Sequence, residues 1–186
     1  MNRYINQLSS LMDDIFSKYR KQKNAKEKVG VLVSGGIDSS IVAHYCKKYF
    51  PKQTVLFSFG TPISKDRPYV DLLQKHLDLP LIWLSINQDL ITTSFNIVKK
   101  LLETINLSNS LMHLSLAAGY FLICQTSAQA GIRDIFTGQG PDVIMAGYSK
   151  YKRLMNQEAG NNELIKQAII KDLDNLEIDK TRDNAM

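Results

Sequence analysis

Ser34-Gly35-Gly36-Ile37-Asp38-Ser39-Ser40 directly follows a short apolar run over 29–33 that predicts a buried strand. Thr137-Gly138-Gln139-Gly140-Pro141-Asp142 follows a second such run over 132–136. A glycine-rich turn that leaves a strand and opens a helix directs several backbone N–H groups outward, beside the positive end of the helix dipole. The two turns therefore predict a cradle for phosphate groups.

Helix and strand patterns alternate around these turns. Hydrophobic spacing predicts further strands over 54–59 and 81–86, and helices over 3–20, from the first glycine turn to Pro51, and over 66–77, 88–104, 110–130, 149–157 and 162–175. This order predicts an α/β fold in one domain, 1–186, with a parallel sheet, helices on both of its faces and a helical C-terminal part. Ligands of such sheets bind at the carboxyl ends of the strands, where both glycine turns are expected.

The composition sets broad limits. The chain has 186 residues, 44% of them hydrophobic, which is enough for one domain with a sizeable core. The net charge of +5 permits nucleic-acid binding, but the excess of positive charge lies mostly between residues 18 and 28 and favours a solvated helix end and loop.

Because no uninterrupted apolar run approaches about 18 residues and the polar start is no signal peptide, we expect a cytoplasmic protein outside the membrane. Cys46 and Cys124 lack C-x-x-C spacing, so two buried thiols are predicted.

The first turn supplies what a pyrophosphate group needs. Gly35 and Gly36 let phosphates approach the backbone, and the serine hydroxyls of 34–40 can donate hydrogen bonds to phosphate oxygens. Asp38 would repel phosphate unless it binds Mg²⁺, whose charge reverses that repulsion. No lysine follows the glycines, so the pattern differs from the Walker A loop G-x-x-x-x-G-K-[ST]. The turn predicts binding of ATP with Mg²⁺.

Both turns resemble the motifs of a known superfamily. The first is similar to S-G-G-x-D-S, the signature of the PP-loop ATP pyrophosphatases, which have an adenine nucleotide alpha hydrolase-like fold. The second, continued to Tyr148, resembles the asparagine synthetase segment S-G-E-G-x-D-E-x-F-G-G-Y. Thr181-Arg-Asp-Asn-Ala-Met186 resembles the R-D-x-x-A-M stretch of the same family. The resemblance extends from about Val29 to the last residue.

The resemblance implies an ATP-dependent, adenylate-forming carbon–nitrogen ligase of asparagine biosynthesis. Such an enzyme splits ATP between its α- and β-phosphates, converts a small carboxylate into an acyl-adenylate, and lets an amine displace AMP. Glutamine-dependent members also have a glutaminase domain. We expect none in this chain, so ammonia would be free or would come from a partner subunit.

The family's site can be carried over residue by residue. Gln139 and Asp142 are the implied catalytic positions, and Asp38 and Asp142 would share Mg²⁺. Gln139 stands where the family has a glutamate, and an amide cannot take a proton from ammonium at neutral pH. The implied nucleotide contacts are Leu32, Val33, Ser34, Gly35, Gly36, Asp38, Ser39, Ser40, Phe59, Thr137 and Gly138.

Two other functions fit parts of the sequence. A PP-loop enzyme that modifies RNA suits the positive charge, although the cysteine pairs of a tRNA thiolase are absent. A nucleotide-binding module or regulatory subunit without turnover suits Gln139 and Val143, since the family has carboxylates at both positions. The apolar stripe of the helix over 3–20 could serve a partner or a second copy as well as the core.

Overall fold

We describe a computed structural model over residues 2–105, 110–145, 147, 149–157 and 162–178. The chain divides into two compact units, Met1–Gly138 (unit 1) and Gln139–Met186 (unit 2), which are described separately. The sequence-based prediction of a single domain over 1–186 stays a prediction.

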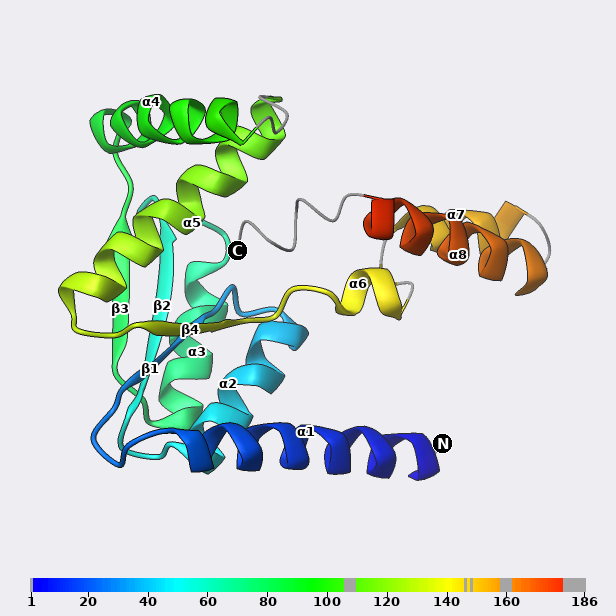
Figure 1. Cartoon of the computed structure of the whole chain (residues 1–186), viewed down its shortest axis with the longest axis horizontal. Coiled ribbons are helices and arrows are strands. Elements are labelled where there is room, and N and C mark those ends of the chain that lie inside the picture. Colours follow the sequence, from blue (N-terminus) through cyan, green and yellow to red (C-terminus); the bar gives the residue numbers. More distant parts are fainter. Residues whose placement is uncertain (1, 106–109, 146, 148, 158–161, 179–186) are drawn as a thin grey trace. The chain divides into compact units, whose positions relative to one another are not determined.

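Unit 1 is built on a parallel sheet of four strands, as the alternating pattern predicts (Figure 1). The order across the sheet is β3-β2-β1-β4. Val29 lies opposite Thr54 on one side and Asp134 on the other, so β1 is a central strand. The strands are β1 (Val29–Leu32), β2 (Thr54–Gly60), β3 (Leu81–Ser85) and β4 (Asp134–Thr137).

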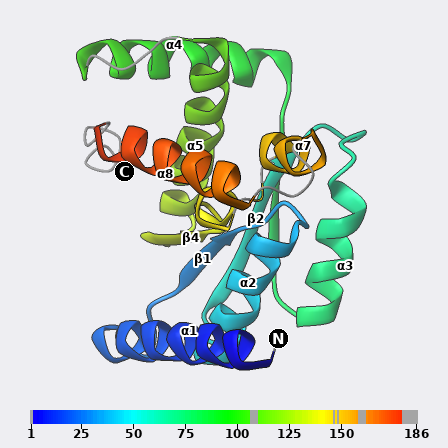
Figure 2. The same ribbon diagram turned by 90° about the vertical axis from the view of Figure 1, so that its right-hand side faces the viewer.

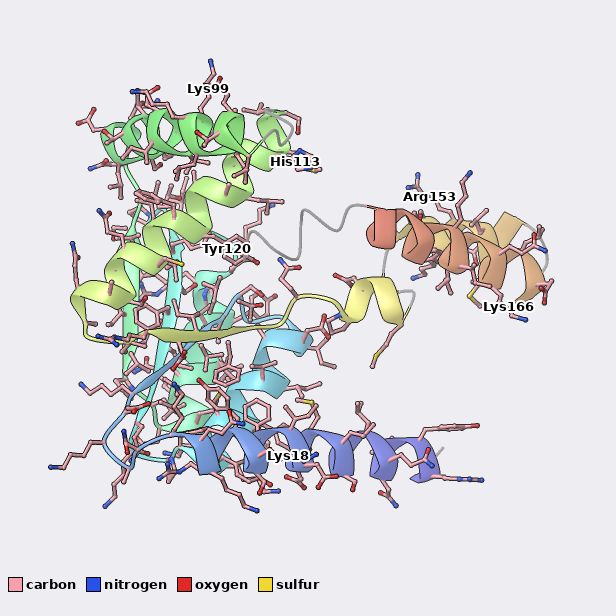
Figure 3. The ribbon with its side chains drawn as sticks, in the orientation of Figure 1. Lys18, Lys99, His113, Tyr120, Arg153 and Lys166 are labelled. Atoms are coloured by element: carbon pink, nitrogen blue, oxygen red, sulfur yellow. The ribbon has the colours of Figure 1, made fainter. Side chains whose placement is uncertain are left out.

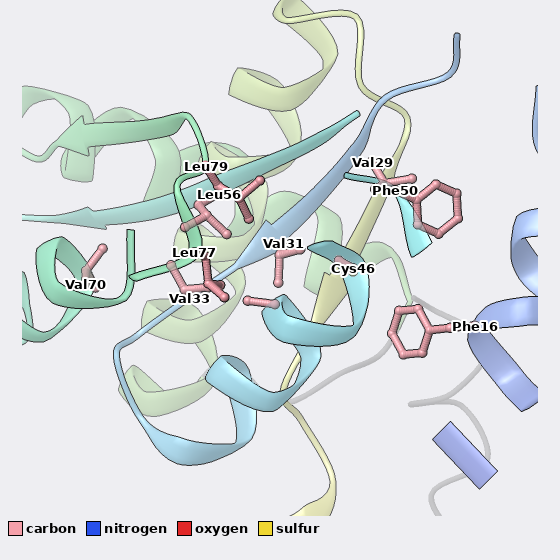
Figure 4. Packing of buried hydrophobic residues seen from close by; sticks show 11 residues of the cluster. Phe16, Val29, Val31, Val33, Cys46, Phe50, Leu56, Val70, Leu77 and Leu79 are labelled. Atoms are coloured by element: carbon pink, nitrogen blue, oxygen red, sulfur yellow. The ribbon is translucent and has the colours of Figure 1, made fainter. Parts of the chain in front are cut away.

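Helices cover both faces of this sheet, which confirms the predicted α/β architecture. On one face, Val31 and Leu56 pack with Phe16, Cys46 and Val70 from three helices (Figure 4). On the other face, Phe57 packs with Ile123 and Ile132. The helices are α1 (Asn2–Gln22), α2 (Ile37–Tyr49), α3 (Arg67–Leu77), α4 (Gln88–Thr104) and α5 (Leu111–Gln129).

The ends of these helices follow from local sequence signals. The Asn87 side chain caps α4 by accepting a hydrogen bond from Leu90 N at 2.8 Å. At the end of α5, Gly131 has φ +71°, and Ile132 N donates to Ser127 O at 2.8 Å. This is the Schellman pattern, in which a left-handed glycine closes the last turn of a helix. Ile132 is therefore part of the helix cap, and β4 begins at Asp134, two residues later than the apolar run predicts.

Packing of α1 joins the start of the chain to the sheet. The Phe16 ring stacks on Tyr45 and Phe136 at centroid distances of 5.6 and 5.2 Å. The Lys23 ammonium forms an ion pair with the Asp134 carboxylate, which lowers the pKa of Asp134. Figures 1 and 2 both show α1 and α4 at opposite ends of unit 1.

α5 combines buried and exposed positions along its length. Among the described helices, it is long and apolar enough to cross a membrane by length and composition, with 28% of the relevant window buried. It packs against α4 in a cluster that includes Val98 and Ala118. The prediction that Cys124 is buried is wrong, because it lies next to the buried Ile123 on a neighbouring, exposed face of α5. Cys46 is fully buried, as predicted, and burial raises the pKa of its thiol.

Unit 2 is helical, with a short helix that the sequence did not predict. Tyr151 is 1% exposed, and its hydroxyl donates to the Asp172 carboxylate. Lys150 forms an ion pair with the same carboxylate and, with that hydroxyl, lowers the pKa of Asp172. The unpredicted helix is α6 (Pro141–Ile144), and it precedes α7 (Ser149–Gln157) and α8 (Asn162–Ile178).

Candidate functional site

The first glycine turn lies at the carboxyl edge of the sheet, next to the end of β4. Leu32 of β1 is the register partner of Thr137 of β4. Because these strands are parallel and adjacent, Ser34 and Gly138 leave the sheet at the same edge. The structure therefore brings the two predicted turns together at Gly138, the last residue of unit 1.

Gly35 occupies a position that only glycine fits. Its φ is +75°, a left-handed conformation that is costly for residues with a Cβ atom. A Cβ atom at this position would overlap the Cβ atom of Tyr69 and lie 3.0 Å from its carbonyl carbon. The turn is therefore packed directly against the first turn of α3.

Serine side chains hold the shape of this turn. Ser39 is 6% exposed, and its hydroxyl donates to Gly36 O at 3.1 Å and accepts from Ser34 N at 3.2 Å. The Ser40 hydroxyl donates to the same carbonyl at 2.7 Å, and the Ser34 hydroxyl accepts from Gly36 N at 3.3 Å. These hydroxyls have a structural role here, and their predicted contacts with phosphate stay predictions.

The amino end of α2 carries no side-chain cap. Gly36 is its N-cap residue, in an extended conformation with φ −75° and ψ 163°, and it makes no side-chain capping bond. The first intrahelical bond runs from Ser40 N to Gly36 O at 3.1 Å. The N–H groups of the first turn, together with the helix dipole, can therefore receive an anion.

Gly138 places the second turn directly against this helix end. A Cβ atom on Gly138 would lie 2.5 Å from Ser39 N and 2.9 Å from the carbonyl carbon of Asp38. Backbone therefore meets backbone, and a side chain at 138 would fill the space beside the first N–H groups of α2. This close approach joins the two glycine motifs into one structure.

The other predicted nucleotide contacts differ in how far their side chains are exposed near this edge. Phe59, at the end of β2, is 36% exposed, and its ring lies over Gly119 of α5, where a Cβ atom would come within 2.7 Å of Cζ. Leu32 and Thr137 are half-buried. Val33 is 2% exposed within the core, so its side chain does not face the edge, and only its backbone could meet a ligand.

Gln139 and Asp142 belong to unit 2, whereas Asp38 belongs to unit 1. Both are exposed, and Asp142 lies in the first turn of α6. Gly147 N donates to Asp142 O at 2.9 Å, and a Cβ atom on Gly147 would overlap the Asp142 carboxylate. Their predicted catalytic and metal-binding roles stay predictions, and Thr181–Met186 lies outside the described residues.

No group of three or more His, Cys, Asp or Glu residues that could hold a metal ion occurs in the described ranges. Asp38 is half-buried in the first turn of α2, beside the uncapped helix end. A single carboxylate suits Mg²⁺, which commonly uses one or two protein carboxylates and takes its other ligands from phosphates and water.

Two residues at this site were not predicted from the sequence. Tyr69 meets Gly35 through its backbone and Cβ atom, and no sequence pattern marks such a contact. Gly119 was open to prediction, because a glycine inside a helix costs about 1 kcal/mol relative to alanine and often marks a close approach.

A glycine cradle at the carboxyl ends of two adjacent parallel strands, β1 and β4, is the arrangement expected of a nucleotide-binding α/β domain. The family model described as asparagine synthase matches residues 17–185, and the chain belongs to that family. A curated relative, the putative asparagine synthetase [glutamine-hydrolyzing] 1 of Methanocaldococcus jannaschii, is 29% identical over 156 residues. That match covers 84% of this chain but only 27% of the relative, so the chain spans about a quarter of its length.

The fold is shared with a solved structure. The NH3-dependent NAD synthetase of Campylobacter jejuni, solved in complex with the nitrate ion, superposes with a TM-score of 0.55 at 18% sequence identity. The match covers 94% of this chain and 84% of that chain. It supports the predicted α/β fold with a parallel sheet covered by helices.

Proposed function

We propose that the glycine cradle binds ATP, with the pyrophosphate part at the uncapped amino end of α2. The observation that carries this proposal is the approach of Gly138 to the backbone of Asp38 and Ser39. Gly138 keeps side-chain atoms away from Ser39 N, and the N-cap residue Gly36 has no side chain of its own to cap the helix. That arrangement suits an anion that approaches the backbone closely.

Magnesium would accompany the nucleotide. Asp38 is the unit 1 residue suited to hold it, with phosphate oxygens as further ligands. Asp142 is the second proposed ligand and follows Gly138 by four residues, which an extended chain spans in at most about 14 Å. The metal would neutralise phosphate charge that otherwise repels these carboxylates.

The proposed reaction is the formation of an amide from a carboxylate and ammonia, of the asparagine synthetase type. A carboxylate oxygen attacks the α-phosphorus of ATP, the bond to the β-phosphate oxygen breaks, and pyrophosphate leaves. Ammonia then attacks the acyl carbon, loses a proton, and AMP leaves. The relative's printed name includes glutamine hydrolysis, so a glutaminase part or partner would be one source of this ammonia.

Gln139 favours a second candidate, a nucleotide-binding module without turnover. An amide in place of the family's glutamate can donate or accept a hydrogen bond but cannot remove a proton from the attacking amine. Val143 removes a second carboxylate from the same segment.

Calorimetric titration of MgATP into the full chain tests the binding proposal. Asp38→Ala should weaken MgATP binding at least about tenfold, since a charged metal contact is lost. Asp14→Ala removes an exposed carboxylate from α1 and should leave binding unchanged. Equal affinity of the native chain and Asp38→Ala would contradict the role of Asp38, and absence of binding would contradict the site.

A pyrophosphate assay on the same sample separates the two candidates. Release of pyrophosphate with a carboxylate, and of AMP when ammonium is added, supports the ligase. MgATP binding without pyrophosphate release across a panel of carboxylates supports the module. Gln139→Glu restores the family's carboxylate, and a gain of turnover in this variant would show that Gln139 is what limits the reaction.

A further inference from the structure

A glycine lies inside α5 at the point where the ring of Phe59 meets this helix. Phe57 and Phe59 are two positions apart on β2, so both side chains lie on the α5 face of the sheet. Phe57 packs against Ile123 and is fully buried. Phe59 meets α5 one helical turn earlier, at Gly119, and is 36% exposed. Tyr120, labelled in Figure 3, marks this part of the helix.

The absence of a side chain at Gly119 leaves room for this ring. A Cβ atom at position 119 would lie 2.7 Å from Cζ, 3.3 Å from Cε2 and 3.4 Å from Cε1 of Phe59. The first distance is well inside the optimal separation of two carbon atoms, so an alanine would force the ring away from α5. Gly119 lies within the helix and has no positive φ, so the ring and not the backbone calls for glycine here.

Phe59 lies level with the beginning of the first glycine turn. Leu32 of β1 pairs with Phe57 of β2, and Val33 N donates to Phe57 O at 2.8 Å. Continued by two residues, this parallel register places Phe59 opposite Ser34. Neighbouring strands are about 4.8 Å apart, so the ring stands beside the edge from which the turn leaves the sheet.

The two faces of the sheet differ in their chemistry at this edge. On the α2 face, the uncapped N–H groups at the start of the helix suit phosphate. On the α5 face, Phe59 is apolar, and Leu32 packs in the same apolar cluster as Phe57. A nucleotide whose pyrophosphate part lies at α2 would therefore extend its base across the end of β1 toward Phe59, because a flat base stacks favourably on an aromatic ring.

We propose that Gly119 is a positioning residue for the base of the nucleotide, because it lets the Phe59 ring lie back against α5 and keeps the base subsite open. This inference rests on the proposed ATP site and adds the group that sets the room at its base end. In Gly119→Ala the ring would move toward the open edge of the sheet, since the core on its other side is closed by Phe57. It would then occupy the space that the base needs, while the phosphate cradle would keep its shape.

Calorimetric titration of the full chain with two ligands, MgATP and magnesium tripolyphosphate, tests this role. Gly119→Ala should weaken MgATP binding at least about tenfold, because stacking of the base is lost. It should leave tripolyphosphate binding unchanged, because that ligand has phosphates but no base. Ser115→Thr is the matched control and should change neither affinity, since it adds one methyl group to an exposed position of α5 and keeps the hydroxyl that donates to Leu111 O.

A second variant separates displacement of the ring from a general change in α5. Phe59→Leu removes Cε1, Cε2 and Cζ, the three ring atoms that a Cβ atom at position 119 would meet. In this background there is no ring to displace. Gly119→Ala should therefore change the MgATP affinity of Phe59→Leu by less than about twofold, which is the coupling expected of two residues in contact.

The outcomes distinguish this inference from the proposed function. If the native chain binds neither ligand, the proposed ATP site is wrong and the inference falls with it. If the native chain binds MgATP and Gly119→Ala binds it equally well, or loses both ligands to the same degree, only the role of Gly119 is overturned. An equal effect of Gly119→Ala in the native and Phe59→Leu backgrounds would also overturn that role alone.

Discussion

In the first glycine turn, Gly35 combines a positive φ with crowding by neighbouring backbone, whereas the second turn divides these two properties between two glycines. Gly138 has no positive φ, but its space is filled by the backbone of α2. Gly140 has φ +108°, yet a Cβ atom there would meet no heavy atom within 4 Å in the described part of the chain. Crowding therefore marks the glycines that bring two backbones together at the site, and positive φ alone marks a change of chain direction.

Gly35→Ala should have the largest effect, because it violates both conditions. The left-handed conformation costs about 1–2 kcal/mol for a residue with a Cβ atom, and overlap with Tyr69 adds about 1–3 kcal/mol. Urea denaturation should show a lower free energy of unfolding by about 3 kcal/mol, and MgATP binding should be lost. A native urea midpoint would show that α3 can move away from the turn.

Gly138→Ala should follow, because it violates only the crowding condition. Displacing the backbone of Ser39 and Asp38 should cost about 1–3 kcal/mol of stability and should weaken MgATP binding more than tenfold, by roughly 1.4 kcal/mol or more. Calorimetry and urea denaturation of the same protein measure both effects. Binding of native strength would mean that the close approach at 138 does not shape the site.

Ser39→Ala examines the bonds that hold the first turn. Removing the buried hydroxyl leaves Ser34 N and Gly36 O without this partner, which should cost about 1–2 kcal/mol. Ser40→Ala is the matched control, since that hydroxyl is less buried and donates only to Gly36 O, so a smaller loss is expected. If the two variants unfold at the same urea concentration, the Ser39 network is not what stabilises the turn.

Gly140→Ala should have the smallest effect, because only the φ condition is violated. We expect a loss of about 1 kcal/mol in the free energy of unfolding and a smaller change in MgATP affinity than for Gly138→Ala. A Gly140→Ala variant that binds MgATP as poorly as Gly138→Ala would remove the distinction between the two glycines.

Local sequence signals predicted most of unit 1. The strands over 29–33 and 54–59 stand out because both are short and mostly apolar, and Pro51 marks the end of the helix between them. The location of both glycine turns at the carboxyl edge followed from a general property of parallel sheets. The pairing of Leu32 with Thr137 adds that their two strands are neighbours. In contrast, α6 was missed because a helix of four residues, beginning at Pro141, is too short to show helical periodicity.

The contacts that shape the site were less accessible to prediction. Whether Gly35 is crowded depends on how α3 packs, and that packing is decided by distant residues such as Val70 and Leu77 in the core. Val33 was included among the nucleotide contacts that the family resemblance implies, but alternation along the strand turns its side chain into the core. Residues next to a motif in the sequence therefore lie near the site, but their side chains need not face it.

The position of β4 in the sheet has a consequence for the order in which this protein folds. β1 lies between β2 and β4 in the sheet. Val29 of β1 pairs with Asp134 of β4, although the two residues are roughly a hundred positions apart in the chain. Pairing between such distant segments forms late and slowly, since the loop-closure entropy must be overcome first. The first glycine turn is thus synthesised early but is completed only when Gly138 arrives, so a nascent chain released before β4 would carry the S-G-G-I-D-S sequence without a finished cradle.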